Sequence, residues 1–453
     1  MADGPTRYYF FSGKGGVGKT TMAAATAAHH ADRGLKTLIV TTDPASNLAD
    51  VFEQRIGHRV TAIDGFAHLY AMEIDVDTAT LEYKERALAP FREAFPTEMV
   101  AVMEEQLNSP CTEEMAAFDK FVDFIDDQSW DVVIFDTAPT GHTIRLLELP
   151  VEWSRHIAES EEGSGQTCMG PVEVLKGAKE KYDRAVGLLR DPERTTFVFV
   201  LQPEGTSIAE TKRAAAELAE IGIHSRLLVI NGILPPDECT HPFFRKRSEM
   251  QQHYIREVET GTDLPVKKMY LLGEEVKGLD LLRLIARRLW GNGSAEAATE
   301  PTYPAAEADR PRRPRRTPAT TGIRVEEYLF PKNGQNRAVF FAGKGGVGKT
   351  SLSCITGMWL ARQGLRTLVV TTDPAAHLGE VFGQPVGFEI TPLAGVENLS
   401  AVKIDPKREA EAYKKRILDD AAEKYAPEAL AVIKEQLDSP CTEEMATFDK
   451  FLD

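Results

Sequence analysis

The sequence predicts an α/β protein in which a mostly parallel sheet carries helices on both faces, and in which this unit occurs twice. The first observation is an alternation of short apolar, β-rich runs with segments of helical spacing, the pattern of parallel strands joined by helices. The second is an octet, Gly-Lys-Gly-Gly-Val-Gly-Lys-Thr, that stands at Gly13–Thr20 and again at Gly343–Thr350. The apolar runs of the first copy are Tyr8–Phe11, Thr37–Thr41, Asp131–Phe135, Thr196–Leu201 and Arg226–Ile230.

A constant offset of 330 residues relates the two copies along the 453-residue chain. Sixteen of nineteen residues are identical between Glu105–Asp123 and Glu435–Asp453, which fixes the alignment of the repeat. We therefore predict a tandem, pseudo-twofold duplication. Its parts are a first half at 1–290, a flexible linker rich in proline and arginine at 291–336, and a second half at 337–453. Counterparts of 124–290 would lie beyond residue 453, so the second half is expected to be incomplete and the sequence a fragment.

Each octet has the spacing of a P-loop, the turn between a strand and a helix that holds nucleotide phosphates. The first follows an apolar strand and opens a helix of small residues, Thr21–Ala28, and this context disfavours a turn without a ligand. Its backbone N–H groups would surround phosphate oxygens, and Lys19 would reach the β- and γ-phosphates. The predicted nucleotide-binding residues are Gly13, Gly15, Gly16, Val17, Gly18, Lys19, Thr20 and Thr21, and in the second half Gly343, Lys344, Gly345, Gly346, Val347, Gly348, Lys349, Thr350, Ser351 and Asp373.

Two aspartates follow predicted strands and have the chemistry of phosphoryl transfer. Asp43, in Thr-Thr-Asp-Pro, stands where a carboxylate could orient or deprotonate the attacking water. The alternative for Asp43 is an ordinary turn or helix cap. Asp136 ends an apolar strand and is suited to organise the water shell of Mg²⁺, while the hydroxyls of Thr20 and Thr350 are expected to hold the ion directly.

Composition disfavours several other classes of function. The net charge of −16 argues against nucleic acid as a principal partner, because phosphate binding needs clustered cations. No stretch is long and apolar enough to span a bilayer, and the N-terminus lacks the apolar core of a signal peptide, so we expect a cytoplasmic protein. Five scattered cysteines are too few for a disulfide framework, and those that matter should be thiolates or ligands.

The segment that begins at Asp136, Asp-Thr-Ala-Pro-Thr-Gly-His-Thr, resembles the ArsA family and its close relative, the ATPase that targets tail-anchored membrane proteins. The resemblance covers 7–290 and 337–453. It includes the Lys-Gly-Gly-x-Gly-Lys form of the P-loop, whose first lysine crosses a dimer interface to the partner's nucleotide in such ATPases. It therefore implies that Lys14 completes the site of the second half and Lys344 that of the first. The implied catalytic residues are Lys14, Lys19, Asp43, Asp136 and Lys344.

The resemblance also implies a metalloid site made by three cysteines. Cys111 and Cys441, each within Ser-Pro-Cys-Thr-Glu-Glu, and Cys168 match the positions from which the family supplies thiolates to As(III) or Sb(III). Soft thiolates suit a soft metalloid, and the resemblance places His142 near this site as a possible further ligand. The alternative is that each cysteine is a small buried residue, as free cysteines usually are.

Three other residues are interpreted by the same comparison. Asn231, which follows a predicted strand, resembles the family's adenine-recognising asparagine, although asparagine is also a common turn residue. Cys354 is the counterpart of Ala24 and is expected to fill the core. Cys239 stands where the tail-anchored targeting relatives carry a Cys-x-x-Cys zinc pair, but Pro242 takes the place of the second cysteine, which argues against a zinc-bridged homodimer.

The function implied is an arsenite- or antimonite-stimulated ATPase that energises a membrane extrusion pump, with ATP and Mg²⁺ as cofactors and As(III) or Sb(III) as activating ligand. The expected partner is a membrane arsenite-efflux protein that holds the ATPase at the inner face of the membrane, and the resemblance also allows for a metallochaperone that delivers As(III). The alternative is a chaperone for tail-anchored proteins, which needs a large apolar groove, whereas Glu152–Asp191 is rich in Glu, Lys, Gly and Ser. A third class is an ATP-binding scaffold without useful turnover.

Overall fold

The computed structural model of the chain describes sixteen stretches of the sequence. These stretches are residues 6–43, 48–94, 96–108, 110–137, 147, 166–167, 170–291, 326–331, 336–343, 347–371, 378–422, 424–426, 430, 433–434, 437–438 and 442–452.

An eight-stranded sheet of order β10-β9-β8-β1-β5-β2-β4-β3 forms the centre of the first half. Every neighbouring pair is parallel except β3 with β4, which confirms the predicted fold class. The five predicted apolar runs correspond to β1, β2, β5, β8 and β9, with ends that differ by up to three residues. The strands are β1 (Arg7–Ser12), β2 (Thr37–Thr41), β3 (Thr61–Ala62), β4 (Leu69–Glu73), β5 (Val132–Asp136), β8 (Thr195–Leu201), β9 (Ser225–Ile233) and β10 (Val266–Tyr270).

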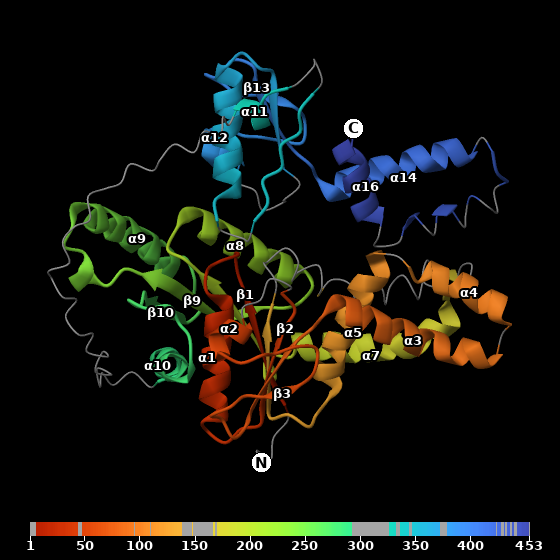
Figure 1. Cartoon of the computed structure of the whole chain (residues 1–453), viewed down its shortest axis with the longest axis horizontal. Coiled ribbons are helices and arrows are strands. Elements are labelled where there is room, and N and C mark those ends of the chain that lie inside the picture. Colours follow the sequence, from red (N-terminus) through yellow and green to blue (C-terminus); the bar gives the residue numbers. More distant parts are fainter. Residues whose placement is uncertain are drawn as a thin grey trace.

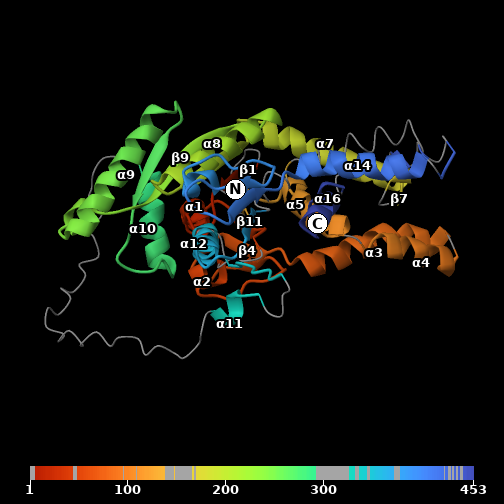
Figure 2. The same ribbon diagram turned by 90° about the horizontal axis from the view of Figure 1, so that it is seen from above.

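Helices cover both faces of this sheet (Figures 1 and 2). One face packs on α1, α2 and α10, and the other on α3, α4, α5, α7, α8 and α9. The helices are α1 (Lys19–Ala31), α2 (Leu48–Phe52), α3 (Val76–Ala94), α4 (Thr97–Gln106), α5 (Pro110–Asp126), α7 (Val172–Arg190), α8 (Gly205–Glu220), α9 (Pro242–Thr260) and α10 (Leu279–Trp290), with a 3-10 turn, η1 (Pro236–Glu238), and a two-stranded hairpin, β6 (Gln166–Thr167) and β7 (Gly170–Pro171). No helix within the described stretches is long and apolar enough to cross a membrane.

Alternate residues of the central strands serve opposite cores, as a strand buried on both faces requires. Phe10 stacks between Phe135 and Phe197, with ring centroids 4.7 and 4.6 Å away, on the face that carries α5. Phe11 and Ile134 point to the other face, where the alanine-rich α1 lies close to the sheet. The small side chains of α1 therefore bring the P-loop helix close to the strands that precede and flank it.

The second half repeats part of this arrangement at the same offset. Its three-stranded sheet has the order β11-β13-β12, with β11 and β13 parallel and β12 antiparallel. Its elements are α12 (Lys349–Arg362), β11 (Thr367–Thr371), α13 (Leu378–Phe382), β12 (Thr391–Pro392), β13 (Leu399–Lys403), α14 (Pro406–Ala422) and α16 (Thr442–Leu452).

The segment 337–342, the counterpart of β1, is not a strand in the second half. In the first half β1 pairs with β5 and β8, and by the offset the counterparts of both carry numbers above 453. Phe340 in this segment is 72% exposed, whereas its counterpart Phe10 is fully buried. Within the expected linker the short helix α11 (Glu326–Leu329) is present, and Phe330 after it contacts the Trp359 ring of α12 at 5.6 Å.

A buried histidine lies where α1 meets α10. His30 packs between Tyr9 and Trp290, and neither ring nitrogen has a hydrogen-bond partner among the described residues. Burial, reinforced by His29 and Arg33, lowers the pKa of His30 from 6.5 to about 4. As the pH falls, His30 binds a proton near pH 6.5 in the unfolded chain but only near pH 4 in the folded protein. This residue therefore lowers the free energy of unfolding as the pH falls from about 6.5 to about 4.

Replacing His30 by leucine, the residue at the counterpart position Leu360, should remove this loss. Between pH 7 and pH 5 the free energy of unfolding of the wild type should fall relative to that of His30→Leu by up to about 2 kcal/mol. Denaturant unfolding at both pH values measures the difference. His224→Gln, at an exposed histidine, is the control, and parallel pH profiles for the wild type and His30→Leu would contradict the argument.

Candidate nucleotide site

The P-loop follows β1 directly and is shaped by glycines that no other residue could replace. Gly13 has φ 150°, and a Cβ there would lie 2.1 Å from the carbonyl oxygen of Val200 in β8. Gly18 has φ 95° and caps the N-terminus of α1. The loop therefore combines a left-handed backbone with the positive end of a helix, the combination that binds phosphate groups.

Asp136, the last residue of β5, lies beside the first turn of α1. The hydroxyl of Thr20 donates to its Oδ2 at 2.8 Å, and the hydroxyl of Thr41 approaches the same oxygen at 3.4 Å. The carboxylate is fully buried, and Oδ1 has no hydrogen-bond partner within the described residues. Burial raises the pKa of Asp136 to about 6, against the lowering effects of Thr20 and Lys19. A buried carboxylate with one unpartnered oxygen beside a P-loop threonine fits a divalent cation.

The two P-loop lysines and Asp43 lie around this centre. Lys19 Nζ donates to the carbonyl of Lys14 at 3.4 Å, within the loop. Lys14 Nζ donates to the hydroxyl of Thr206 at 3.2 Å, so in this structure Lys14 is directed to α8 of its own half. The backbone N–H of Asp43 donates to Thr41 Oγ1 at 3.2 Å, and the Asp43 carboxylate raises the pKa of Asp136 as a smaller contribution. The sheet thus brings Lys19, Asp43 and Asp136 together at one edge.

Asn231 lies against the P-loop. Its side-chain amide donates to the carbonyl of Val17 at 2.8 Å, and a Cβ on Gly18 would come within 2.3 Å of the same nitrogen. In this structure the asparagine therefore supports the backbone of the phosphate loop. Thr206 is a contact that the sequence analysis did not single out, although Gly205-Thr-Ser after a predicted strand is the kind of polar segment expected at this edge.

The second P-loop has the same local backbone where the structure describes it. Gly343 and Gly348 have φ 156° and 93°, close to the values of Gly13 and Gly18, and Lys349 Nζ donates to the carbonyl of Gly343 at 2.9 Å. A Cβ on Gly348 would meet no heavy atom of the described residues within 4 Å, whereas a Cβ on Gly18 would meet Asn231. Of the predicted residues, Lys344, Gly345, Gly346 and Asp373 lie outside the described residues.

The predicted thiol site is described only in part. Cys111 is the second residue of α5, but its side chain is outside the described part of the chain, as are Cys168, Cys441 and His142. Cys354 is fully buried, in agreement with a core role. Cys239 is also buried, and its thiol donates to the carbonyl of Pro235 at 3.3 Å. Among the residues that are described, no group of three or more His, Cys, Asp and Glu side chains could hold a metal ion.

A parallel sheet whose first strand runs into a phosphate-binding loop, with a buried aspartate at the end of the adjacent strand, defines a P-loop nucleoside triphosphatase. Sequence comparison identifies the family within this class. The chain belongs to the anion-transporting ATPases, whose family model matches residues 6–291 and 336–453. The chain is therefore an ATP-binding and ATP-hydrolysing enzyme, as the sequence analysis predicted.

Individual relatives align over different lengths. A Halobacterium salinarum protein provisionally assigned as an arsenical pump-driving ATPase is 47% identical over 99% of this chain and 70% of its own length. An Escherichia coli arsenical pump-driving ATPase is 36% identical over 98% of this chain and 73% of its own. The Arabidopsis thaliana ATPase GET3A is 32% identical over 62% of this chain and 83% of its own.

Gly18→Ala should abolish nucleotide binding at the first P-loop, because the new methyl group would meet Asn231 in a loop whose backbone must stay in place. Titration with a fluorescent ATP analogue, in a chain whose second P-loop carries Lys349→Ala, measures the loss. Gly34→Ala is the matched control. Gly34 has φ 81°, and a Cβ there would meet no heavy atom within 4 Å. The substitution therefore imposes a similar backbone strain, about 1–2 kcal/mol, without a steric contact like that between Gly18→Ala and Asn231. Equal affinity in the Gly18→Ala and Gly34→Ala proteins would contradict this account of the loop.

Proposed function

We propose that this ATPase hydrolyses ATP in response to arsenite or antimonite and so energises metalloid extrusion through a membrane pump. The observation that carries the proposal is the length of the alignments. Two relatives named for driving arsenical pumps match through both halves and the segment between them, over 98–99% of the chain. The duplicated form of the chain is thus shared with those relatives, whereas GET3A aligns over 305 residues, about one copy of the repeated unit.

For hydrolysis we assign roles to the residues that meet at the edge of the sheet. The backbone N–H groups of the P-loop and Lys19 hold the phosphates. Asp43 orients the attacking water, since positioning is most of what phosphoryl transfer requires of a protein. Lys344 of the second half would stabilise charge at the first site, and Lys14 would do so at the second. For Lys14 this requires leaving Thr206, a neutral hydroxyl contact that a phosphate oxygen could replace.

Mg²⁺ fits this site through Thr20 and Asp136. When bound, the ion would neutralise charge that develops on the phosphates. Asp136 must be ionised to assist it, and because its pKa is about 6 the carboxylate is ionised at neutral pH even without the ion. Thr20 already donates to Asp136, so the two residues are held in the mutual orientation that such a site needs.

For activation we assign the thiols of Cys111, Cys168 and Cys441 to the metalloid, with His142 near them. Cys111 is the second residue of α5, and Cys441 directly precedes α16. The positive end of a helix favours the thiolate, which is the form that binds a soft metalloid. One of these cysteines belongs to the second half, so a metalloid bound by all three would draw the halves together. The receiving partner would be a membrane efflux protein, with the ATPase acting at the inner face of the membrane.

A chaperone for tail-anchored proteins is the second candidate. The shorter alignment with GET3A, the absence of a second cysteine at Pro242 and the burial of Cys239 against Pro235 disfavour it. Measuring ATP turnover with and without arsenite, and with a hydrophobic transmembrane peptide as competing ligand, separates the two. Stimulation by arsenite alone supports the pump ATPase, and stimulation by the peptide alone supports the chaperone.

Cys→Ser at Cys111, Cys168 or Cys441 should abolish arsenite stimulation, because two thiolates cannot replace a three-coordinate site. The measurement is the ratio of stimulated to unstimulated ATP turnover over a range of As(III) concentrations. Cys354→Ser is the matched control, since Cys354 lies in the core of the second half. Undiminished stimulation in the triple Cys→Ser protein would remove the metalloid assignment.

Lys344→Ala should slow hydrolysis at the first P-loop although the lysine belongs to the second. The test uses a chain in which Lys349→Ala disables the second P-loop, so that turnover reports the first site alone. Loss of one charged transition-state contact is expected to lower turnover by about a hundredfold or more. An unchanged rate would show that Lys344 does not act across the interface.

A further inference from the structure

Gln251 of α9 is a buried polar side chain that bonds to the end of β9. The residue is only 5% exposed. Its Oε1 accepts a hydrogen bond from the backbone N–H of Leu234 at 2.9 Å, and its Nε2 donates to the carbonyl of Gly232 at 3.0 Å. Each end of the amide therefore has the kind of partner that a buried glutamine needs, and the side chain ties the helix to the backbone on both sides of Ile233.

The strand is irregular at the point that Gln251 holds. Along β9 the register with β10 advances three residues, from Ile230 to Ile233, while along β10 it advances two, from Lys268 to Tyr270. One residue of β9 is therefore extra, and Gly232, with φ 72°, lies in this stretch. An extra residue of this kind forms a β-bulge, which bends the strand locally and redirects a side chain.

The side chain directly before Gly232 is Asn231, which contacts the P-loop. Its amide nitrogen donates to the carbonyl of Val17 at 2.8 Å, and a Cβ on Gly18 would lie 2.3 Å from the same nitrogen. A bulge interrupts the ladder of backbone hydrogen bonds, and Gln251 supplies partners to two backbone groups there. The strand conformation that directs Asn231 to the phosphate loop is therefore held from α9.

We propose that Gln251 is a positioning residue of the nucleotide site. It fixes the bulge of β9, and the bulge keeps the amide of Asn231 on the carbonyl of Val17, so that the P-loop backbone stays in the shape that binds phosphates. Gln251 itself contacts the end of β9 and acts on the nucleotide only through Asn231. This role concerns ATP binding alone and does not depend on activation by a metalloid.

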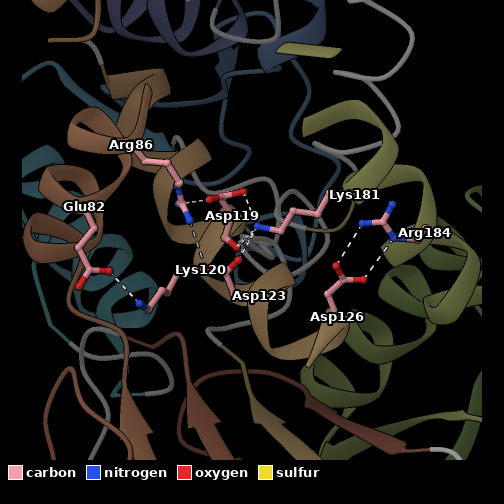
Figure 3. Close-up of polar contacts among 8 residues, drawn as sticks. All are labelled: Glu82, Arg86, Asp119, Lys120, Asp123, Asp126, Lys181 and Arg184. Carbon is pink, nitrogen blue, oxygen red and sulfur yellow. Dashed lines mark hydrogen bonds and ion pairs between the residues drawn. The ribbon is translucent and has the colours of Figure 1, made fainter. Parts of the chain in front are cut away.

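A cluster of ion pairs in the same half provides a comparison (Figure 3). Asp119 of α5 contacts Arg86 of α3 and Lys181 of α7, and Lys181 Nζ, on a side chain that is 17% exposed, donates to Asp119 Oδ1 at 2.7 Å. The Lys181 contact is also mostly buried, but it joins helix to helix. Loss of Lys181 should therefore lower stability without changing nucleotide affinity, whereas loss of Gln251 should change both.

The main experiment measures binding of a fluorescent ATP analogue to full chains that carry Lys349→Ala, so that the first P-loop alone is reported. Gln251→Leu keeps most of the side-chain volume but has neither donor nor acceptor. Its dissociation constant should rise about tenfold, as is typical when an outer hydrogen bond that orients a binding group is lost. The controls are Val258→Ala, at a buried position of the same helix, and Lys181→Met. Both should leave the dissociation constant unchanged even where they lower the melting temperature.

A double-mutant cycle separates positioning from a structural role. In an Asn231→Ala background, Gln251→Leu should cause little further loss of affinity, because its effect passes through Asn231. The same substitution should still lower the melting temperature in that background. A residue with a structural role only would lower the melting temperature in both backgrounds and the affinity in neither.

Inorganic tripolyphosphate tests whether the effect lies at the phosphates, since this ligand has no base. Its affinity, measured by competition with the fluorescent analogue, should fall in Gln251→Leu by about the same factor as that of ATP. A loss confined to ATP would overturn the proposal, because Asn231 would then act on the base and not on the P-loop.

Three other results would overturn it. They are an unchanged affinity in Gln251→Leu, an equal loss in Val258→Ala, and a full tenfold loss when Asn231→Ala is already present. If Gln251→Leu does not fold, Gly232→Ala replaces it with the same expected outcomes. Gly232 has φ 72° and the nearest atom to a Cβ there is 3.8 Å away, so the new methyl group strains the bulge without a clash. Gly34→Ala, at φ 81°, is the control for that variant.

Discussion

The placement of β1 between β5 and β8 is the constraint on which the nucleotide site depends. Both neighbours lie more than a hundred residues further along the chain, yet only this order brings the P-loop beside Asp136 and gives Gly13 its close approach to Val200. In the second half the described segment 337–342 is not a strand, and Phe340 is exposed. In the first half the local motif forms a site because strands from distant parts of the chain flank it.

Several residues of the nucleotide site lower the stability of the fold. Asp136 is fully buried with its pKa raised to about 6, so at neutral pH the folded chain holds an ionised carboxylate where burial opposes the charge. Because the folded pKa lies above the ordinary value of 3.8, this cost is largest above pH 6 and disappears as the pH falls toward 4. A bound cation would offset it. Gly13 and Gly18 likewise hold backbone conformations that only glycine adopts easily. These are the places where stability and phosphate chemistry oppose each other.

The sequence was sufficient for the features that repeat or alternate, and insufficient for those set by tertiary contacts. The central strands were found because both of their faces are buried, as in Phe10 and Phe11 of β1. In contrast, β10 at the sheet edge has the sequence Val-Lys-Lys-Met-Tyr. Its exposed positions leave no clear alternation of apolar and polar residues from which a strand could be predicted. The contacts of Lys14 with Thr206 and of Lys181 with Asp119 join residues 192 and 62 positions apart, and no local pattern contains that information.

The route between the candidate thiols and the phosphates is constrained by where α5 is anchored. Its C-terminal end is fixed to the start of β1, since the Tyr8 hydroxyl donates to the carbonyl of Ile125 at 2.7 Å. This anchor lies at the sheet edge opposite to the P-loop. The end of β5 reaches the P-loop itself: Thr137, directly after Asp136, donates to the carbonyl of Phe11 at 2.8 Å, two residues before Gly13. Under the proposed function, this contact is the place where a change at the end of β5 would be passed to the base of the P-loop.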